Sequence, residues 1–433
     1  VPGQRLAPQG QSPPALPTPS IPTPSPWRHQ GLKGLAILGW TLAGLAAIDL
    51  AINLLFAYPK DPNQPASSLA TYFNYGRSTE GKLVQLLGAS DAQSSPLAQA
   101  GWLTPEALAS HPSRPARNGA PSIALYGMSF TDQIGKALGE IDPDLGLRAI
   151  AAPSGGPSYA LAAYSADQAQ WERSPSGQPA QPEVVILGIL AHSVKSLQSL
   201  TGATWLFESP SAYTYPRYRL QNGQLTAIPP LVESLAKLRS TLADPAQGQA
   251  YRAQLAQEDA FYHPLLFQAS PLDASSTLRL LRRSLAQRHQ AQVEARIHDP
   301  QAGFIDPATN QLLAALVTDF AQQARDRNQL PIVLLIDSQN YDDHLLQVLQ
   351  PSLSASNIPY LSTNSLAQAS DPRSYVADGH FTAENNRAIA QSLLEIIDSE
   401  LNNLETSNSG MNNSDQSNRL LQTQPKTQTQ PKS

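Results

Sequence analysis

Two runs of consecutive apolar residues constrain the fold of this chain most strongly. Residues 183–189 read Glu-Val-Val-Ile-Leu-Gly-Ile, and residues 331–337 read Pro-Ile-Val-Leu-Leu-Ile-Asp. Strands as uniformly apolar as these are typical of a parallel sheet that is buried on both faces. Segments with helical spacing lie between and after such runs, so the pattern alternates strand and helix.

The same alternation extends from about residue 121 to residue 402. Strands are expected over residues 123–126, 147–151, 183–189, 331–337 and 359–361, and helices over 130–138, 159–170, 312–327, 344–349 and 383–401. Repeated strand–helix units form a parallel sheet with helices on its faces. We therefore predict an α/β fold with a doubly wound, flavodoxin-like parallel sheet, in which functional residues gather at the carboxyl ends of the strands.

Residues 195–310 interrupt this alternation. They begin with a group of aromatic residues and continue into a helix-rich, partly basic stretch; the aromatic residues are Trp205, Phe207, Tyr213, Tyr215 and Tyr218. An insertion after the third strand would lie over the rim of the site. It would act as a lid or substrate platform, or it would simply pack on the edge of the domain.

Residues 34–58 form an apolar run of 25 residues near the N-terminus. A helix of this length spans a hydrocarbon core of ~30 Å. Asp49 and Asn53 interrupt the run, and a carboxylate inside a membrane is costly. A signal peptide is the competing interpretation, but the run is longer than a typical signal core and follows a proline-rich tail. We expect a retained single transmembrane helix rather than a cleaved or interfacial segment.

The charges beside this run predict its orientation. Arg5, Arg28 and Lys33 precede it, and no acidic residue occurs before Asp49. Because basic residues favour the cytoplasmic side, residues 1–33 are expected in the cytoplasm. The rest of the chain would then be extracytoplasmic, which makes this a single-pass cell-membrane protein with a periplasmic domain.

Composition divides the chain into five segments. Residues 1–33 are rich in Pro, Gln, Ser and Thr and are predicted to be a disordered tail, as are the polar residues 403–433. Between them we expect the transmembrane helix 34–58, a connector over 59–120, and the α/β domain over 121–402 with its insertion at 195–310.

Charge and cysteine content exclude several function classes. The formal net charge is −5, so the chain has no basic nucleic-acid footprint. There are no cysteines, which excludes disulfides, thiol catalysis and cysteine-based zinc sites. Asp342, Asp343 and His344 are consecutive and cannot all face one ion, so they are expected on a solvated helix face. We expect neither a metal nor an organic cofactor.

Three side chains could supply acyl-transfer chemistry. Ser129 follows Gly127-Met128 at the end of the first expected strand, and Asp378-Gly-His380 precedes the last helix. A serine nucleophile needs a base to take its proton, and that base needs an acid to orient it. This order of residues points to ester hydrolysis or acyl transfer. The alternative is structural: Ser129 and Asp378 would cap helices and His380 would be a solvated loop residue.

The oxyanion of a tetrahedral intermediate needs two or three hydrogen-bond donors. The backbone amide of Ser129 is one candidate, and Gly155 or Gly156, in the turn after the second strand, is another. His192 or Ser193, in the loop after the third strand, could supply a side-chain donor. In the alternative interpretation, His192 is a polar loop residue without this role.

Four blocks of the chain resemble the SGNH/GDSL hydrolase superfamily, and within it the membrane-anchored bacterial branch. They are residues 126–131 (Tyr-Gly-Met-Ser-Phe-Thr), 151–159 (Ala-Ala-Pro-Ser-Gly-Gly-Pro-Ser-Tyr), 215–225 (a Pro-Arg-aromatic segment) and 378–387 (Asp-Gly-His-Phe-Thr through Asn-Arg). The chain departs from the family at Met128, where the family has aspartate, and in residues 188–193, which lack the family's asparagine.

This resemblance implies that Ser129 is the nucleophile, His380 the general base and Asp378 the residue that orients it, with Gly155, Gly156 and His192 near the oxyanion. The implied activity is that of a serine esterase or O-acyltransferase on an acylated cell-envelope or extracellular glycan, or on a small ester. Two alternatives stay open. The domain could be catalytically impaired and bind glycan through residues 205–218, or it could serve a multi-pass membrane acyltransferase as a subunit.

Overall fold

The computed structural model describes residues 26–173 and 181–422, and the chain divides into two units, Val1–Leu55 and Phe56–Ser433. In the first unit, the described residues form one helix, α1 (Pro26–Leu55). Its segment Lys33–Leu55 has a mean hydropathy of 2.0 and is long and apolar enough to cross a membrane. The helix begins earlier than the predicted residue 34, so residues 26–33 are helical, whereas residues 1–25 of the predicted tail lie outside the described residues.

A mostly parallel six-stranded sheet forms the centre of the second unit, as the alternating pattern predicted. Its order is β1-β3-β2-β4-β9-β10. The strands are β1 (Ser113–Arg114), β2 (Ser122–Met128), β3 (Gly146–Ala152), β4 (Val184–Leu190), β9 (Leu330–Ile336) and β10 (Tyr360–Ser362). Only the edge strand β1 is antiparallel to its neighbour in this sheet. Since β3 and β4 flank β2 on opposite sides, the direction of winding reverses at the carboxyl end of β2.

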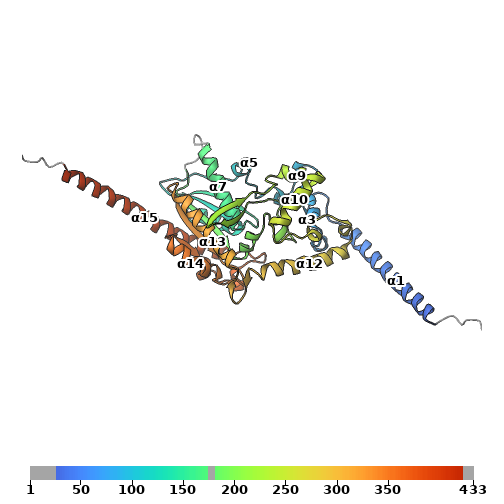
Figure 1. Ribbon diagram of the computed structural model, residues 1–433. Helices are drawn as coiled ribbons and strands as arrows, with labels where there is room; N and C mark the ends of the chain where they lie inside the picture. The colour runs from blue at the N-terminus through green and yellow to red at the C-terminus, as the bar shows by residue number, and fades with distance from the viewer. Residues whose placement is uncertain (1–25, 174–180, 423–433) are drawn as a thin grey trace, which may run out of the picture. The chain divides into compact units, whose positions relative to one another are not determined.

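Helices cover both faces of this sheet (Figure 1). On one face lie α6 (Ser129–Ile141) and α15 (Ala383–Gln422), and on the other lie α7 (Pro157–Arg173), α13 (Pro307–Arg325) and α14 (His344–Ala355). Alternate residues of the central strand β4 enter different cores. Ile186 belongs to the core beneath α6 and α15, and Val185 belongs to the core beneath α7, α13 and α14. The uniformly apolar strands are therefore buried on both faces.

The predicted connector and insertion fold together beside the sheet domain. The connector contains α2 (Ser68–Asn74), α3 (Thr79–Leu87), η1 (Asp91–Gln93), α4 (Pro96–Gln99) and α5 (Pro105–Ala109). The insertion contains η2 (Ala191–Gln198), α8 (Gly202–Trp205), β5 (Arg217–Gln221), β6 (Gln224–Ile228), α9 (Leu235–Ala243), α10 (Pro245–Glu258), α11 (Pro264–Phe267), η3 (Pro271–Ala274), α12 (Ser276–Glu294), β7 (His298–Asp299) and β8 (Gly303–Phe304).

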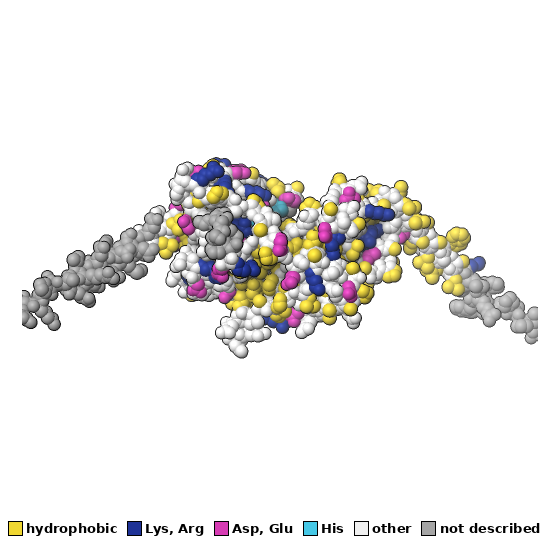
Figure 2. All heavy atoms as spheres, turned by 90° about the horizontal axis from the view of Figure 1, so that it is seen from above, with side chains coloured by type: hydrophobic (Ala, Val, Ile, Leu, Met, Phe, Trp, Pro, Cys, Tyr) yellow, Lys and Arg dark blue, Asp and Glu magenta, His cyan; other side chains and the backbone are white. Residues whose placement is uncertain are grey.

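Polar contacts join these two segments across long sequence distances. The hydroxyl of Ser78 donates to Asp273 at 2.6 Å, and Arg252 pairs with Glu80 at 2.7 Å. We call the structure formed by residues 59–120 and 195–310 the polar lobe. Figure 2 shows basic and acidic side chains interspersed over the second unit on the face in view.

Two predicted boundaries differ from the structure. The last helix, α15, continues to Gln422, although residues 403–433 were predicted to be disordered; residues 423–433 lie outside the described residues. Extending an existing helix requires much less free energy than nucleating one, which lets α15 run into a polar sequence. The apolar helix α1 ends at Leu55 rather than at Tyr58, shortly before Pro59, and proline disfavours helical conformation in the residue that precedes it.

Candidate active site

Ser129 lies where the first parallel strand meets its helix. Strand β2 ends at Met128 and α6 begins at Ser129, so the side chain stands at the carboxyl edge of the sheet. Met128, in an extended conformation, occupies the cap position, and its side chain makes no capping bond. In the described chain, the Ser129 hydroxyl makes no capping contact with a helix amide but lies 2.8 Å from His380 Nε2. The capping interpretation of Ser129 is therefore wrong.

Close packing explains the glycine two residues before this serine. A Cβ atom built on Gly127 would lie 2.4 Å from the Thr131 hydroxyl and 2.9 Å from the carbonyl oxygen of Gly188. Such distances are too short for any side chain. Gly127 therefore lets the first turn of α6 pack against β2 and β4, and this packing sets the position of Ser129.

A short loop brings His380 to the serine. Its ends are joined by a β-bridge between Tyr375 and Phe381, whose rings stack at 5.4 Å. Inside the loop, the amide of Val376 donates to the carbonyl of His380 at 2.8 Å, and Gly379 adopts a φ of +87° that favours glycine. The imidazole of His380 therefore points out of a tight turn rather than from a flexible segment.

The ring of Phe130 supports the imidazole from α6, the helix that begins at Ser129. The two ring centroids are 4.7 Å apart, and Phe381 meets Phe130 edge-on at 5.2 Å. The sequence analysis missed this contact because nothing in the sequence links residue 130 to a ring 250 positions later. The aromatic residues that flank Asp378-Gly-His380 were the available signal for a closed loop.

Asp378 lies next to the imidazole on its far side. Its Oδ1 atom is 3.1 Å from Nδ1 of His380 and accepts the backbone amide of the same residue at 3.1 Å. The Nδ1 contact is close but is not aligned as a hydrogen bond. The hydrogen bond from the His380 amide and the contact with its ring hold the pKa of Asp378 below its usual range. The carboxylate is thus charged at neutral pH, although 68% of its side chain is exposed.

The two glycines predicted near the oxyanion lie in the turn after β3. The amide of Gly155 donates to the carbonyl of Ala152 at 3.0 Å, so it is already engaged in this turn. A Cβ atom on Gly155 would lie 2.8 Å from the Gly127 carbonyl, which places Gly155 beside the end of β2. Gly156 accepts the amide of Ala160 at the start of α7, and within the described chain its own amide has no acceptor.

The side chain of His192 belongs to a different cluster. Its ring packs against Trp205 and Tyr341, with centroid distances of 6.3 and 5.9 Å. Burial and the nearby ammonium of Lys195 lower the pKa of His192 to about 4, so the ring is neutral at neutral pH. No contact joins His192 to Ser129 or His380 in the described chain. The neighbouring Ser193 hydroxyl is also engaged, since it donates to the Leu190 carbonyl at 2.7 Å.

His344 is not on a solvated face, contrary to prediction. It is buried, and its Nδ1 atom lies 3.0 Å from Nε2 of His298, at the end of the insertion. The prediction failed because the partner lies 46 residues away, on the hairpin of β7 and β8. Among the described residues, no group of three or more His, Cys, Asp or Glu side chains is placed to hold a metal ion.

Asp337 directly follows β9 and is fully buried. Its Oδ2 atom accepts the Ser362 hydroxyl and the Asn364 amide, both at 3.0 Å, and so ties β9 to the turn after β10. Its other oxygen has no partner in the described chain. Burial raises the pKa of Asp337 to about 7, although the hydrogen bond from Ser362 acts in the opposite direction.

Comparisons with known proteins add little to this geometry. No protein-family model matches the chain, and no curated protein matches it in sequence. A solved structure from Desulfitobacterium hafniense, described as a lipolytic protein of the G-D-S-L family, is 8% identical, with a TM-score of 0.29 over 64% of this chain and 99% of that one. Esterase B from Lactobacillus Rhamnosis is 11% identical, with a TM-score of 0.23 over 70% and 80%. Likenesses this low carry no argument, so the functional proposal rests on the site itself.

Proposed function

We propose that this protein is a serine-dependent esterase or O-acyltransferase. The observation that carries the proposal is the 2.8 Å contact between Ser129 Oγ and His380 Nε2 at the carboxyl edge of a parallel sheet. A hydroxyl held against an imidazole nitrogen at this distance can pass its proton to that nitrogen as it attacks a carbonyl.

In the first half of the reaction, Ser129 Oγ bonds to the acyl carbon while its proton moves to His380 Nε2. The bond between that carbon and the alcohol oxygen then breaks, and His380 returns the proton to the departing alcohol. In the second half, water or a sugar hydroxyl attacks the acyl-serine and gives its proton to His380. The bond between the acyl carbon and Ser129 Oγ then breaks, and His380 returns the proton to Ser129 Oγ. Water as the acceptor makes the protein an esterase, and a sugar makes it an acyltransferase.

Asp378 would favour the tautomer of His380 that this sequence of steps requires. Its ionised carboxylate, 3.1 Å from Nδ1, favours a proton on that nitrogen and leaves Nε2 free to accept the serine proton. The same carboxylate stabilises the imidazolium that forms during the attack. Because Asp378 is exposed, solvent weakens this effect relative to a buried aspartate.

The donors to the developing oxyanion would be backbone amides at helix starts. The Ser129 amide belongs to the first turn of α6, whose amides have no acceptor within their own helix. The amide of Gly156, before α7, is the second candidate. Gly155 would have to leave its turn to take part, and His192 would have to leave its cluster.

The substrate class rests on location. Arg5 precedes α1, and Arg28 and Lys33 lie in its N-terminal part ahead of the apolar run, which supports a single-pass membrane anchor with the second unit outside the cytoplasm. An enzyme placed there meets acylated cell-envelope or extracellular glycans as well as small esters. A glycan platform on residues 205–218 is disfavoured, because the side chains of Trp205 and Tyr213 are buried.

The test is hydrolysis of p-nitrophenyl acetate by the full chain in a non-ionic detergent. Ser129→Ala should remove at least 99% of the turnover, whereas Ser240→Ala, the same change at an exposed serine of α9, should leave it intact. A fluorophosphonate probe that labels serine nucleophiles should modify the wild type and spare Ser129→Ala. Equal labelling of both proteins would refute the proposal.

One observation favours a second candidate, a catalytically impaired domain that serves a multi-pass membrane acyltransferase. The Gly155 amide is engaged in its turn, and residues 188–193 contain no asparagine that could complete the oxyanion donors. Losing one such donor typically costs about 10²–10³ in rate. This candidate predicts that neither turnover nor probe labelling depends on Ser129, while a multi-pass membrane protein co-purifies with the full chain.

A further inference from the structure

A cavity lies in the polar lobe, outside the candidate active site. It has a volume of about 130 Å³, and its lining includes Lys82 and Leu86 from α3, Tyr75 from the turn after α2, and Glu208 from the insertion. Tyr58, at its rim, follows the last residue of the apolar helix α1 by only three positions in the sequence. The cavity is therefore built mainly from the part of the second unit that comes directly after α1 in the chain, with Glu208, Ser209 and Pro210 added by the insertion.

Lys82 gives this cavity a buried cation. Only 4% of the residue is exposed, and its ammonium lies 3.8 Å from the centroid of the Phe207 ring. The ammonium donates to the carbonyl oxygen of Phe207. Within the described chain, no carboxylate lies within ion-pair distance of it. A buried ammonium without a carboxylate partner is unfavourable unless something else compensates its charge.

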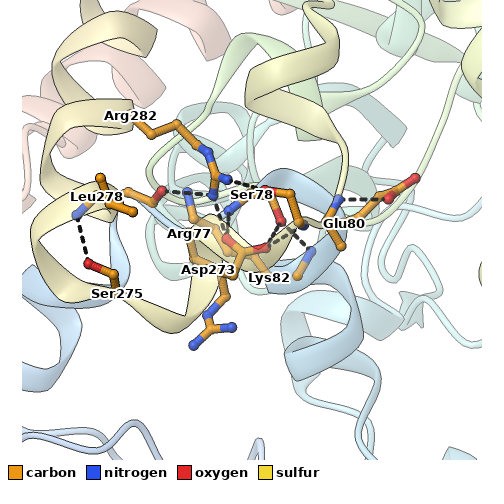
Figure 3. A network of polar contacts seen from close by, with 12 residues as sticks. Arg77, Ser78, Glu80, Lys82, Asp273, Ser275, Leu278 and Arg282 are labelled. Atoms are coloured by element: carbon orange, nitrogen blue, oxygen red, sulfur yellow. Dashed lines mark hydrogen bonds and ion pairs between the residues drawn. The ribbon is translucent and has the colours of Figure 1, made fainter. Parts of the chain in front are cut away.

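The two nearest carboxylates are bound by other cations. Glu208 forms two hydrogen bonds with Arg283, at 2.7 and 3.0 Å, and a third with Gln287 at 2.8 Å. Asp273 receives the amide and the hydroxyl of Ser78 at 2.7 and 2.6 Å, and it pairs with Arg282. In Figure 3 the contacts from Ser78 and Arg282 converge on Asp273, and Lys82 follows Ser78 on the same helix.

A count of charges around Lys82 shows an excess of cations. Four basic residues, Lys82, Arg77, Arg282 and Arg283, face two acidic ones, Glu208 and Asp273, and of these six only Lys82 and Glu208 line the cavity itself. The nearby Glu80 is paired with Arg252 and leaves this balance unchanged. Burial lowers the pKa of Lys82 well below its usual range, and the Arg282 charge acts in the same direction. The negative charge of a bound anion would act in the opposite direction and favour the charged form of Lys82.

The remaining walls combine the polar residues Thr71, Asn74, Gln85 and Ser209 with apolar and aromatic ones. Pro62, Leu86, Leu97 and Pro210 line the cavity together with Tyr58 and Tyr75, and Leu97 is about half exposed at the rim. A volume of about 130 Å³ holds one small head group and no alkyl chain. An apolar portion of the same ligand would have to continue over this rim.

We propose that this cavity binds a phosphate-type anion, with Lys82 as its partner and with any apolar chain of the ligand directed over the rim at Tyr58 and Leu97. A phosphate monoester carries up to two negative charges, which matches the excess of two cations. The ligand would be the head group of an acidic lipid or a soluble phosphate, and the two sources share this chemistry. The site is independent of Ser129 and His380.

Calorimetric titration of the full chain in a non-ionic detergent at pH 7.5 tests the proposal. The probes are dihexanoyl phosphatidic acid, inorganic phosphate, and dihexanoyl phosphatidylcholine, which has no net charge. We expect saturable binding of phosphatidic acid and at least tenfold weaker binding of phosphatidylcholine. Inorganic phosphate that binds as tightly as phosphatidic acid would support a soluble ligand, and weaker binding would support a lipid.

Matched variants connect the binding to the cavity. Lys82→Met keeps the length of the side chain, removes a buried charge, and should weaken binding of phosphatidic acid at least tenfold. Lys237→Met, the same change at an exposed lysine of α9, should have no effect. Leu97→Trp narrows the rim without touching a charge, so it tests the site even if Lys82→Met fails to fold. Absence of saturable binding of both anionic probes, or binding that stays within twofold in a folded Lys82→Met or Leu97→Trp protein, would overturn the proposal.

Discussion

The candidate active site and the polar lobe hold their polar side chains in opposite ways. At the active site, His380 contacts one hydroxyl and one carboxylate, and 68% of the Asp378 side chain is exposed. In the polar lobe, Arg282 is almost fully buried and pairs with Asp273, which also binds Ser78 from a distant part of the sequence. The first arrangement leaves groups accessible for a reaction, and the second uses charges to join segments.

This difference predicts how substitutions divide between rate and stability. Changes at the active site should reduce turnover and leave the free energy of unfolding nearly intact, because few native contacts are lost. Changes in the polar lobe should do the reverse.

The largest expected effect is that of His380→Gln. Removing the base should lower kcat/KM for p-nitrophenyl acetate by about 10³-fold or more, as for other residues of a catalytic triad. The midpoint of urea unfolding should stay unchanged. His263→Gln, at an exposed histidine of the polar lobe, is the matched control and should retain full activity. A residual rate within tenfold of wild type would contradict the role of His380.

Arg282→Met should have the opposite outcome. It leaves the carboxylate of Asp273 buried without its cation, which typically costs about 3–5 kcal/mol of unfolding free energy. The rate per folded molecule should remain that of the wild type. Arg283→Met, which breaks the more exposed pair with Glu208, should cost about 1 kcal/mol or less. Equal losses of stability in the two variants would show that burial does not distinguish these pairs.

Asp337 makes stability depend on pH. Its pKa is about 7 in the folded protein, against 3.8 for an ordinary aspartate. Between these values the folded state keeps a proton that the unfolded state releases, so stability falls as pH rises from about 4 to about 7, by at most about 4 kcal/mol. Urea unfolding at pH 4.5 and 7.5 should show this loss in the wild type and less of it in Asp337→Asn. A loss of the same size in both proteins would contradict the prediction.

Asp378→Asn should have an intermediate effect on rate. A buried triad aspartate is worth about 10⁴ in rate, and because this one is exposed we expect a loss of about 10². Asp371→Asn, at a half-buried aspartate seven positions earlier that pairs with the exposed Arg373, should leave the rate unchanged. The pKa of Asp378 lies below its usual range, so its contribution should persist at mildly acidic pH and disappear only as pH falls through that lowered value. A loss of 10⁴ would instead indicate that substrate covers the carboxylate.

The smallest effect is expected for Gly379→Ala. The added methyl group meets no atom within 4 Å, so the cost is the strain of a φ of +87°, about 1 kcal/mol. Gly119→Ala, at a φ of +77° and in equally open space, should lose the same stability. Only the first variant should reduce turnover, because only Gly379 shapes the loop of His380. Unequal losses of stability would show that the loop carries additional contacts.

The strand and helix order of the sheet domain could be predicted from the sequence because its signals are local. Residues 184–190 and 330–336 are apolar without interruption, and their burial on both sheet faces follows directly. The meeting of Ser129 with His380 was also predictable in outline, since parallel strands bring their carboxyl ends to one edge of the sheet.

The polar lobe could not be predicted, because its contacts are not local. Ser78 and Asp273 are 195 residues apart, and neither lies in a periodic sequence pattern from which a contact between them could be predicted. The direction of the His192 side chain depends on Tyr341, and the burial of His344 depends on His298. Each of these contacts is decided by tertiary packing, which sequence periodicity does not encode.

The separation of the proposed nucleophile from its proposed base has a consequence for biosynthesis. Ser129 and His380 are 251 residues apart, and the loop that carries His380 comes after every strand of the central sheet. While a ribosome is still making the chain, Ser129 is an ordinary alcohol without a base. The contact between Ser129 and His380 therefore forms only after the last strand of the sheet, β10, has been made and the loop that carries His380 has folded.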